Sequence, residues 1–160
     1  PVPVEAKTKM LAFNSWLARA FQFGDFKANC SVGLKTGNSL IGLNIDYYDP
    51  TGMQLIRNEP EKRFGVGLVR IGQTPKILLL YRCDFITKKQ TLKLAPSGKA
   101  PEGKSEALEI LAKGQQAVVS GIHLETNAPY FCGTVEPWDI AGQLDRPPQI
   151  REIEWMAFLA

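Results

Sequence analysis

A regular alternation of apolar and polar residues predicts a strand at positions 39–46, around which the other elements are expected to assemble. Side chains two residues apart in an extended strand point to the same face. One face of this strand would therefore lie against the core, with Ile41, Leu43 and Ile45 as its members. The opposite face would carry two small polar side chains, Asn44 and Asp46, at the end of the strand.

Other segments also have the composition of strands or helices. Further strands are predicted at 30–34, 74–82, 85–94, 105–111 and 115–122. The turn Ala112–Gly114 predicts that the last two pair as a β-hairpin. Helices are predicted at Thr8–Phe21, at 51–57 and from Pro148 to the end, the last with the apolar set Ile150, Ile153, Trp155, Met156 and Leu159.

Three of the predicted strands carry polar side chains on the face away from the core. Asn44 and Asp46 share one such face, Glu109 occupies another, and Lys76 and Arg82 share a third because an even number of residues separates them. Two carboxylates on rigid strands are a usual way to hold Mg²⁺ or Mn²⁺ for phosphoryl transfer. A polar face of this kind is a candidate metal site.

The segment 44–50 has a second interpretation. Asn, Asp and Pro are turn residues, so Asn44 and Asp46 would also suit the start of a turn that runs to Pro50. Taken alone, this segment favours the turn.

Length and composition predict one soluble domain. The chain has 160 residues with 44% hydrophobic content, and no apolar run approaches the roughly 18 residues of a membrane span. The three cysteines, Cys30, Cys83 and Cys132, form no C-x-x-C pair, which favours a reduced cytosolic protein without a zinc site. The chain starts with Pro and stops within a predicted helix, so we expect a domain of a longer protein.

Positive charge gathers in the middle of the chain. From Arg57 to Lys104 there are eleven Lys or Arg and four Asp or Glu, a local charge of +7 within a total of +3. Such a region suits a phosphate-rich partner, and we expect Lys88, Lys89 and Lys93 to contact a nucleic-acid backbone. A solvated lysine-rich surface is an equal alternative on charge alone.

Five segments, taken together and in order, carry a family resemblance. They are VGLKTG at 32–37, GLNID at 42–46, RIGQTPKILLLYR at 70–82, LEILAKGQQAVV at 108–119 and GIHLETNAPY at 121–130. The combination resembles the primase-polymerase domain of phages, prophages and plasmids, which belongs to the archaeo-eukaryotic primase superfamily. The match covers about Cys30 to Trp138 and is far more specific than any one segment.

The resemblance implies a template-dependent nucleotidyltransferase that makes or extends primers with two divalent metals, Mg²⁺ or Mn²⁺. Its substrates would be dNTPs or NTPs, and its template and primer single-stranded DNA. A helicase domain in the same polypeptide is a further implied partner, with no membrane association. The implied location is the cytoplasm of a bacterial host.

The resemblance also assigns roles to residues of this chain. The family's first motif, D-x-D, falls on Asn44 and Asp46, and its third falls on Glu109, which makes these three the catalytic residues and metal ligands. The second motif falls on 74–76, with Lys76 in the place of a histidine. Implied nucleotide contacts are Lys76, Arg82, Arg70, Gln116, Ser120 and His123, the last having a purely structural role as an equal alternative.

Asn44 is the departure from the family that matters most. An amide coordinates a metal through oxygen but carries no charge, so its presence should weaken metal binding and catalysis. Either an aspartate has been replaced here to stop turnover, or the natural protein is an impaired member, and we favour the first. A non-catalytic module that binds single-stranded or origin DNA is the alternative function.

The family implies an α+β fold with a central mixed or mainly antiparallel sheet, an RRM-like lobe and helices at both ends, in one domain spanning 1–160. The site would lie in the cleft between the two lobes. Periodicity alone gives strands in the middle and helices at the ends.

Overall fold

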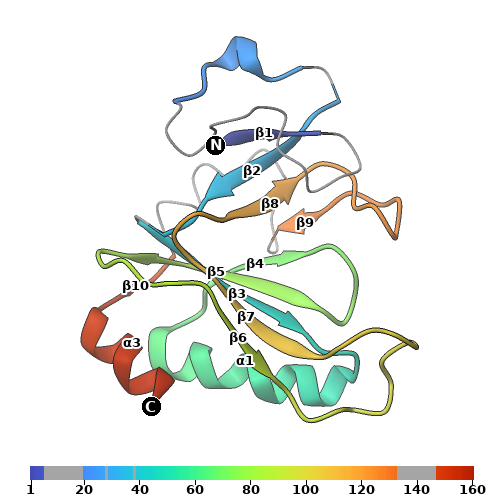
Figure 1. The fold of residues 1–160 in the computed structure, drawn as a ribbon, viewed down its shortest axis with the longest axis vertical. Coiled ribbons are helices and arrows are strands. Elements are labelled where there is room, and N and C mark those ends of the chain that lie inside the picture. The colour runs from blue at the N-terminus through green and yellow to red at the C-terminus, as the bar shows by residue number, and fades with distance from the viewer. Residues whose placement is uncertain (6–19, 28, 38, 133–146) are drawn as a thin grey trace.

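The computed structural model describes residues 1–5, 20–27, 29–37, 39–132 and 147–160. This part of the chain has an α+β fold with two sheets and two α-helices (Figure 1). The helices are α1 (Pro50–Phe64) and α3 (Glu152–Leu159), and a short 3₁₀ turn spans Phe23–Asp25. The strands are β1 (Val2–Val4), β2 (Ser31–Lys35), β3 (Leu40–Asp46), β4 (Leu68–Ile71), β5 (Ile77–Cys83), β6 (Gln90–Lys93), β7 (Ala107–Leu111), β8 (Gln116–Ser120), β9 (Phe131–Cys132) and β10 (Gln149–Ile150).

The larger sheet has the order β6-β7-β3-β5-β4-β9, with β10 pairing in parallel with the end of β5. The other pairings in this sheet are antiparallel. A smaller sheet has the order β1-β2-β8 and is also antiparallel. The expectation of a central sheet with mixed, mainly antiparallel pairing is therefore confirmed.

The face of the larger sheet that carries Ile41, Leu43 and Ile45 is covered by both helices (Figure 1). These three side chains are fully buried, as the alternation in β3 predicted. They pack in one cluster with Phe64 of α1 and Trp155 of α3. Burial of this apolar face is the main stabilising contribution that the fold offers.

The opposite face of the larger sheet divides into an apolar part and a polar part. Leu78 and Leu80 of β5 pack there against Ala117 and Val119 of the smaller sheet. Asn44 and Asp46 lie on the same face as Leu78, at the uncovered end of β3, and are partly exposed. The smaller sheet therefore covers only part of this face and leaves the polar end of β3 accessible.

Helix α1 is longer than the predicted 51–57. Asp49 caps its first turn by accepting a hydrogen bond from the Gly52 N–H at 2.8 Å, and Gly65 ends it with a φ of 85°. Pro60 does not stop the helix. The turn beyond it carries Phe64, whose ring is buried against Tyr81 and Phe158, and this packing favours continuation.

The predicted hairpin of 105–111 and 115–122 is wrong. β7 pairs with β3 on one side and β6 on the other, so it has no free edge for β8. The chain instead turns at Lys113–Gly114 and passes into the smaller sheet, where β8 pairs with β2 (Figure 1). Gly114 has a φ of 83°, a conformation that suits either a hairpin turn or this crossover.

The two predicted terminal helices have different outcomes. The predicted helix at Thr8–Phe21 lies outside the described residues, apart from 20 and 21, which are not helical. The C-terminal helix is confirmed, although it begins at Glu152 and its apolar set is partly wrong. Ile150 and Trp155 are buried, whereas Ile153 and Met156 are exposed. Among the described residues, no helix is both long and apolar enough to cross a membrane.

Substitution of Trp155 tests the helix-covered core. The Trp155 ring is 1% exposed and lies against Phe64, Phe85 and Phe158, with ring centroids 5.7 to 6.3 Å apart. We expect Trp155→Ala to lower the free energy of unfolding by about 3–5 kcal/mol, because it leaves a cavity that the sheet cannot fill. Urea denaturation measures this difference.

Ile153 on the same helix is the matched control, because its side chain is 74% exposed. Ile153→Ala should change the free energy of unfolding by less than about 0.5 kcal/mol. Equal losses for the two variants would contradict the packing described here.

Candidate functional site

Strand register places four polar residues in one row across the larger sheet. Arg70 of β4 lies opposite Leu78 of β5, and Leu78 lies opposite Asn44 of β3. Asn44 in turn lies opposite Glu109 of β7, which lies opposite Thr91 of β6. Directly opposed residues of antiparallel strands project to the same face. Residues that are distant in the sequence, Arg70, Asn44, Glu109 and Thr91, therefore share one surface.

Asn44 joins two carboxylates at the centre of this row. Its side-chain Nδ2 donates hydrogen bonds to Asp46 Oδ2 at 2.9 Å and to Glu109 Oε2 at 3.3 Å. All three side chains are partly buried. The amide thus occupies a position between two negative charges, where a small cation would also be stabilised.

Lys76 lies next to this group, at the Asp46 end. Lys76 comes directly before Ile77 of β5, which pairs with Ile45, so its backbone lies at the Asp46 end of β3. The Lys76 ammonium donates to the Tyr48 hydroxyl at 3.5 Å and lies 5.0 Å from the centre of the Tyr48 ring. The structure thus joins Asp46 and Glu109 through Asn44, and it places Lys76 against Tyr48 beyond the Asp46 end of this group.

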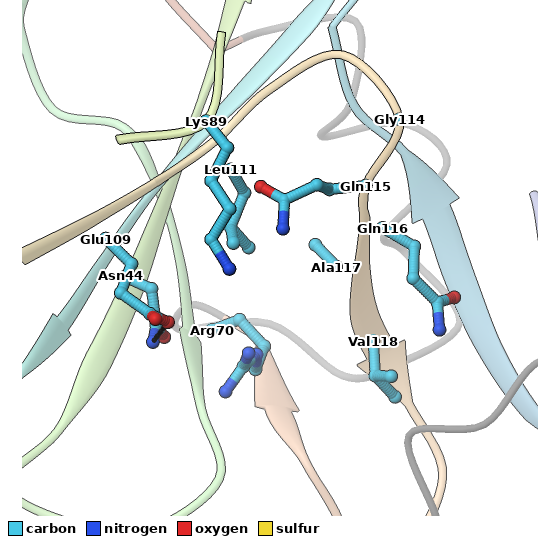
Figure 2. Close-up of a pocket in the computed structure, with 10 residues that line it drawn as sticks. All are labelled: Asn44, Arg70, Lys89, Glu109, Leu111, Gly114, Gln115, Gln116, Ala117 and Val118. Atoms are coloured by element: carbon cyan, nitrogen blue, oxygen red, sulfur yellow. Dashed lines mark hydrogen bonds between the residues drawn. The ribbon is translucent and has the colours of Figure 1, made fainter. Parts of the chain in front are cut away.

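A pocket of about 310 Å³ extends from the row toward the smaller sheet (Figure 2). Asn44 and Glu109 form one wall, and Arg70 approaches from the adjacent side. The Lys89 and Gln115 side chains reach inward between them. The pocket is lined by Asn44, Arg70, Lys89, Glu109, Leu111, Gly114, Gln115, Gln116, Ala117 and Val118. The two sheets therefore form a cleft with the Glu109 carboxylate and the cations Arg70 and Lys89 on its walls.

Glu106 anchors the loop that borders the Asp46 end. Its buried carboxylate accepts hydrogen bonds from the Tyr48 N–H at 2.7 Å, the Ser97 N–H at 2.6 Å and the Ser97 hydroxyl at 2.7 Å. Burial by itself would raise the pKa of Glu106, but these hydrogen bonds outweigh it and hold the pKa below its ordinary value of 4.5. The contact fixes the backbone that carries Tyr48, two residues beyond Asp46.

Two ion pairs hold the same loop at the surface. Lys99 pairs with Asp49, and Lys104 pairs with Glu125 at 3.0 Å. The hydrogen bond from Lys104 lowers the pKa of Glu125, and the same contact raises the pKa of Lys104. Asp46 contributes to the field at Lys104, which places the pair near the acidic group. The positive charges of both lysines are thus used within the protein.

Three predicted nucleotide contacts are not brought to the acidic group. Arg82 lies opposite Leu40, six residues from Asp46 along β3 or roughly 20 Å, and its Nε donates to the Pro147 carbonyl at 3.0 Å. Gln116 is beside the pocket, but its side chain turns away toward β2, where it lies against Gly33 (Figure 2). Ser120 lies opposite Val32 in the smaller sheet and is not among the lining residues. The two-residue period of a strand predicted which face of the sheet a side chain lies on. It gave no information on the distance of that side chain from Asp46.

His123 lies in a setting that suits a structural role, which the sequence analysis gave as the alternative to a nucleotide contact. The ring is 8% exposed and lies edge-on to Tyr130, with centroids 5.3 Å apart. Its Nδ1 accepts a hydrogen bond from the Thr126 N–H at 3.3 Å, and a side chain at Gly72 would collide with the ring. The imidazole therefore holds the turn after β8 against the turn after β4.

The basic residues predicted to contact DNA lie along one edge of the larger sheet. Lys89 lines the pocket, whereas Lys88 is exposed just before β6. Lys93 ends β6 and lies opposite Ala107. Thr91 lies opposite Glu109, so Lys93, two residues farther on, projects to the same face as Glu109.

Sequence reasoning missed Gln115 and Tyr48. Gln115 belongs to the crossover turn and reaches into the pocket, while its neighbour Gln116 does not. The error follows from the predicted hairpin, which gave the wrong orientation to this segment. Tyr48 was read only as part of a turn, and its position beside Lys76 depends on the β3–β5 register, which a single strand pattern does not reveal.

The donor set fits one hard cation. In the part of the chain that the structure describes, no three His, Cys, Asp or Glu side chains gather into a metal site. Asp46, Glu109 and the carbonyl oxygen of Asn44 nevertheless supply three oxygen ligand groups on one face, because rotation of the amide would exchange its nitrogen for its oxygen. Mg²⁺ is commonly held by one or two carboxylates, with water and substrate phosphates completing the coordination.

No family model matches the chain, and no curated protein matches it.

The pH dependence of stability tests the Glu106 anchor. Because the folded-state pKa of Glu106 lies below 4.5, its contribution is fully present above that value and is lost as pH falls through the folded-state pKa. We expect Glu106→Gln to destabilise the protein at neutral pH, and the difference from the unmodified protein to shrink below pH 4.5. Urea denaturation over this range measures both quantities.

Glu102→Gln, an exposed position in the same loop, is the control and should give a curve parallel to that of the unmodified protein. A gap between Glu106→Gln and the unmodified protein that stays constant on acidification would refute the role given to Glu106.

Proposed function

We propose that this chain is a primase-polymerase catalytic domain of the archaeo-eukaryotic primase type, which transfers nucleotides to a 3′-hydroxyl on a single-stranded template. The observation that carries the proposal is the bridge from Asn44 to both Asp46 and Glu109, with Lys76 beside it. These are the positions on which the three motifs of the family fall. Their convergence supports the proposal because sequence spacing alone does not require it.

The charges around the pocket suit a metal–triphosphate complex. Asp46 and Glu109 would hold a divalent cation, and Asn44 would add a neutral oxygen ligand. Arg70 and Lys89 line the pocket together with Glu109, and Lys76 lies against Tyr48, two residues beyond Asp46. A triphosphate needs both kinds of group, cations for its own charge and carboxylates for the metal that it carries.

The residues of this chain have separate tasks in the proposed reaction. When bound, the metal would lower the pKa of the attacking hydroxyl and stabilise charge on the reacting phosphate. Lys76 and Arg70 would orient the triphosphate and neutralise its oxygens. The anchored Tyr48 would keep the Lys76 ammonium on the Asp46 side of the pocket. The pocket walls would exclude part of the water around the phosphates.

Asn44 limits what the site does as it stands. Two metals in one site need more negative charge than two carboxylates provide, because each cation brings two positive charges. The amide instead satisfies both carboxylates by hydrogen bonds in the absence of a cation. We infer that this chain binds one metal weakly and that an aspartate at position 44 is required for efficient transfer.

The substitution Asn44→Asp tests the catalytic assignment. We expect it to confer Mg²⁺- or Mn²⁺-dependent incorporation of dNTPs or NTPs on a primed single-stranded template, at a rate at least on the order of 100-fold above that of the unmodified chain. A gel assay of primer extension measures this rate. Asn44→Asp/Glu109→Gln is the matched control and should return to the background rate.

A thermal readout accompanies the activity assay. Without metal, Asn44→Asp should lower the melting temperature, because three carboxylates then face one another. Mn²⁺ should raise the melting temperature of Asn44→Asp more than that of the unmodified chain. Absence of both incorporation and a metal-dependent thermal shift would reject the catalytic proposal.

A second function is supported by the neutral bridge itself. A module that only binds DNA needs no metal, and Asn44 satisfies the two carboxylates without one. The two functions differ in calorimetry with a dNTP and Mn²⁺. The polymerase proposal expects heat of binding that Asp46→Asn abolishes, whereas the binding module expects no heat from either protein.

A further inference from the structure

The edge of the larger sheet beside the pocket is formed by β6. Within the described residues it is the last strand on this side, so its outer backbone groups have no strand partner. Thr91, Leu92 and Lys93 are exposed there. Exposed edges of this kind are available to bind another chain or a ligand.

Both ends of this edge are held in place. The Lys113 N–H donates to the Thr87 carbonyl at 3.3 Å, and the Trp155 indole N–H approaches the Thr87 hydroxyl at 3.4 Å. At the other end, the Leu94 N–H donates to the Glu106 carbonyl at 3.1 Å. Side chains on β6 are therefore presented from a fixed backbone, which lowers the entropy cost of binding.

Two lysines on this edge face the same way as the acidic group. Lys89 reaches into the pocket (Figure 2), and Lys93 projects to the face of Glu109. Four residues separate them, which is roughly 13 Å along an extended strand. Thr91 lies between them and opposite Glu109. The line from Lys93 to Lys89 thus runs beside the acidic group and ends in the pocket.

These lysines differ from the other lysines of the basic segment. Lys99 and Lys104 are neutralised by Asp49 and Glu125. Among the ion pairs found in the described residues, none involves Lys89 or Lys93. Their charge remains for a partner, and the partner must itself be negative and extended to contact both.

We propose that β6 is the track for the single-stranded template, with Lys89 and Lys93 contacting successive parts of its phosphate backbone. This inference rests on the proposed function, since it identifies the path of that reaction's template. It separates Lys89, which lines the pocket, and Lys93, which projects to the face of Glu109, from Lys88, an odd number of residues from both. Backbone contacts of this kind give affinity that depends on salt and not on base sequence.

Fluorescence anisotropy with a labelled single-stranded DNA oligonucleotide, without metal or nucleotide, tests the track over about 0.05–0.3 M NaCl. Lys89→Gln and Lys93→Gln should each weaken binding roughly 5-fold at 0.1 M salt and reduce the slope of log affinity against log salt by about 0.7. The double variant should weaken binding roughly 25-fold. Lys89→Arg/Lys93→Arg should bind like the unmodified chain, because it keeps both charges.

Lys62→Gln is the matched control, since Lys62 is exposed on α1, which covers the other face of the sheet. It should leave the affinity and the salt slope unchanged. The track is overturned if the unmodified chain does not bind the oligonucleotide, if Lys62→Gln weakens binding as much as Lys93→Gln, or if a duplex of the same sequence binds equally well.

The DNA-binding experiment and the nucleotide-incorporation experiment can fail independently of each other. Nucleotide incorporation by Asn44→Asp together with unchanged DNA binding by the double lysine variant would reject the track alone. Lysine-dependent DNA binding without any metal or nucleotide binding would reject the polymerase and leave the track as the surface of a binding module.

Discussion

The candidate site depends on one constraint, the antiparallel register of β3 with its two neighbours. Pairing of Asn44 with Glu109 on one side and with Leu78 on the other aligns residues that are 65 and 34 positions away in the chain. A slip of one residue in either pairing would turn the polar side chains of that neighbour toward the helices. Buried Leu79 of β5 and buried Leu108 and Ile110 of β7 oppose such a slip, because their removal from the core would expose apolar surface. The same hydrophobic face that stabilises the fold therefore also positions the acidic group.

The sequence predicted those parts of the structure that depend on local pattern. Alternation identified β3 and its two faces, and it placed Glu109 opposite the core, because both follow from the two-residue period of a strand. Pairing partners were less accessible: Ala112–Gly114 has the turn residues of a hairpin, yet the chain crosses there to another sheet. The choice is set by β3 and β6, which occupy the two edges of β7. The positions of Arg82 and Gln116, away from Asp46, were not predicted for related reasons, since the two-residue period of a strand defines a face but neither the distance along it nor the direction of a turn.

The bridge made by Asn44 links the fold to the chemistry of the site. Asp46 and Glu109 lie on either side of Asn44 and repel each other, and the unmodified protein offsets this repulsion with an amide that donates to both carboxylates. An aspartate at position 44 could not donate these hydrogen bonds, so the three carboxylates would need a bound cation to offset their repulsion. At position 44, an asparagine therefore favours stability of the metal-free protein, whereas an aspartate would favour affinity for a metal.

Two of the connections that carry the chain between the sheets lie against each other beside the cleft. The β2–β3 connection and the β7–β8 connection touch: the Thr36 hydroxyl donates to the Ala112 carbonyl at 2.7 Å, and the Thr36 N–H donates to the Gln115 carbonyl at 3.0 Å. Gly37, with a φ of 104°, is in such close contact with Lys113 that a larger residue would not fit. Two adjoining, bonded connections resist the bending that a single linker would allow. At this end of the cleft, the spacing between the two sheets is therefore fixed by the same contacts that fold the connections together.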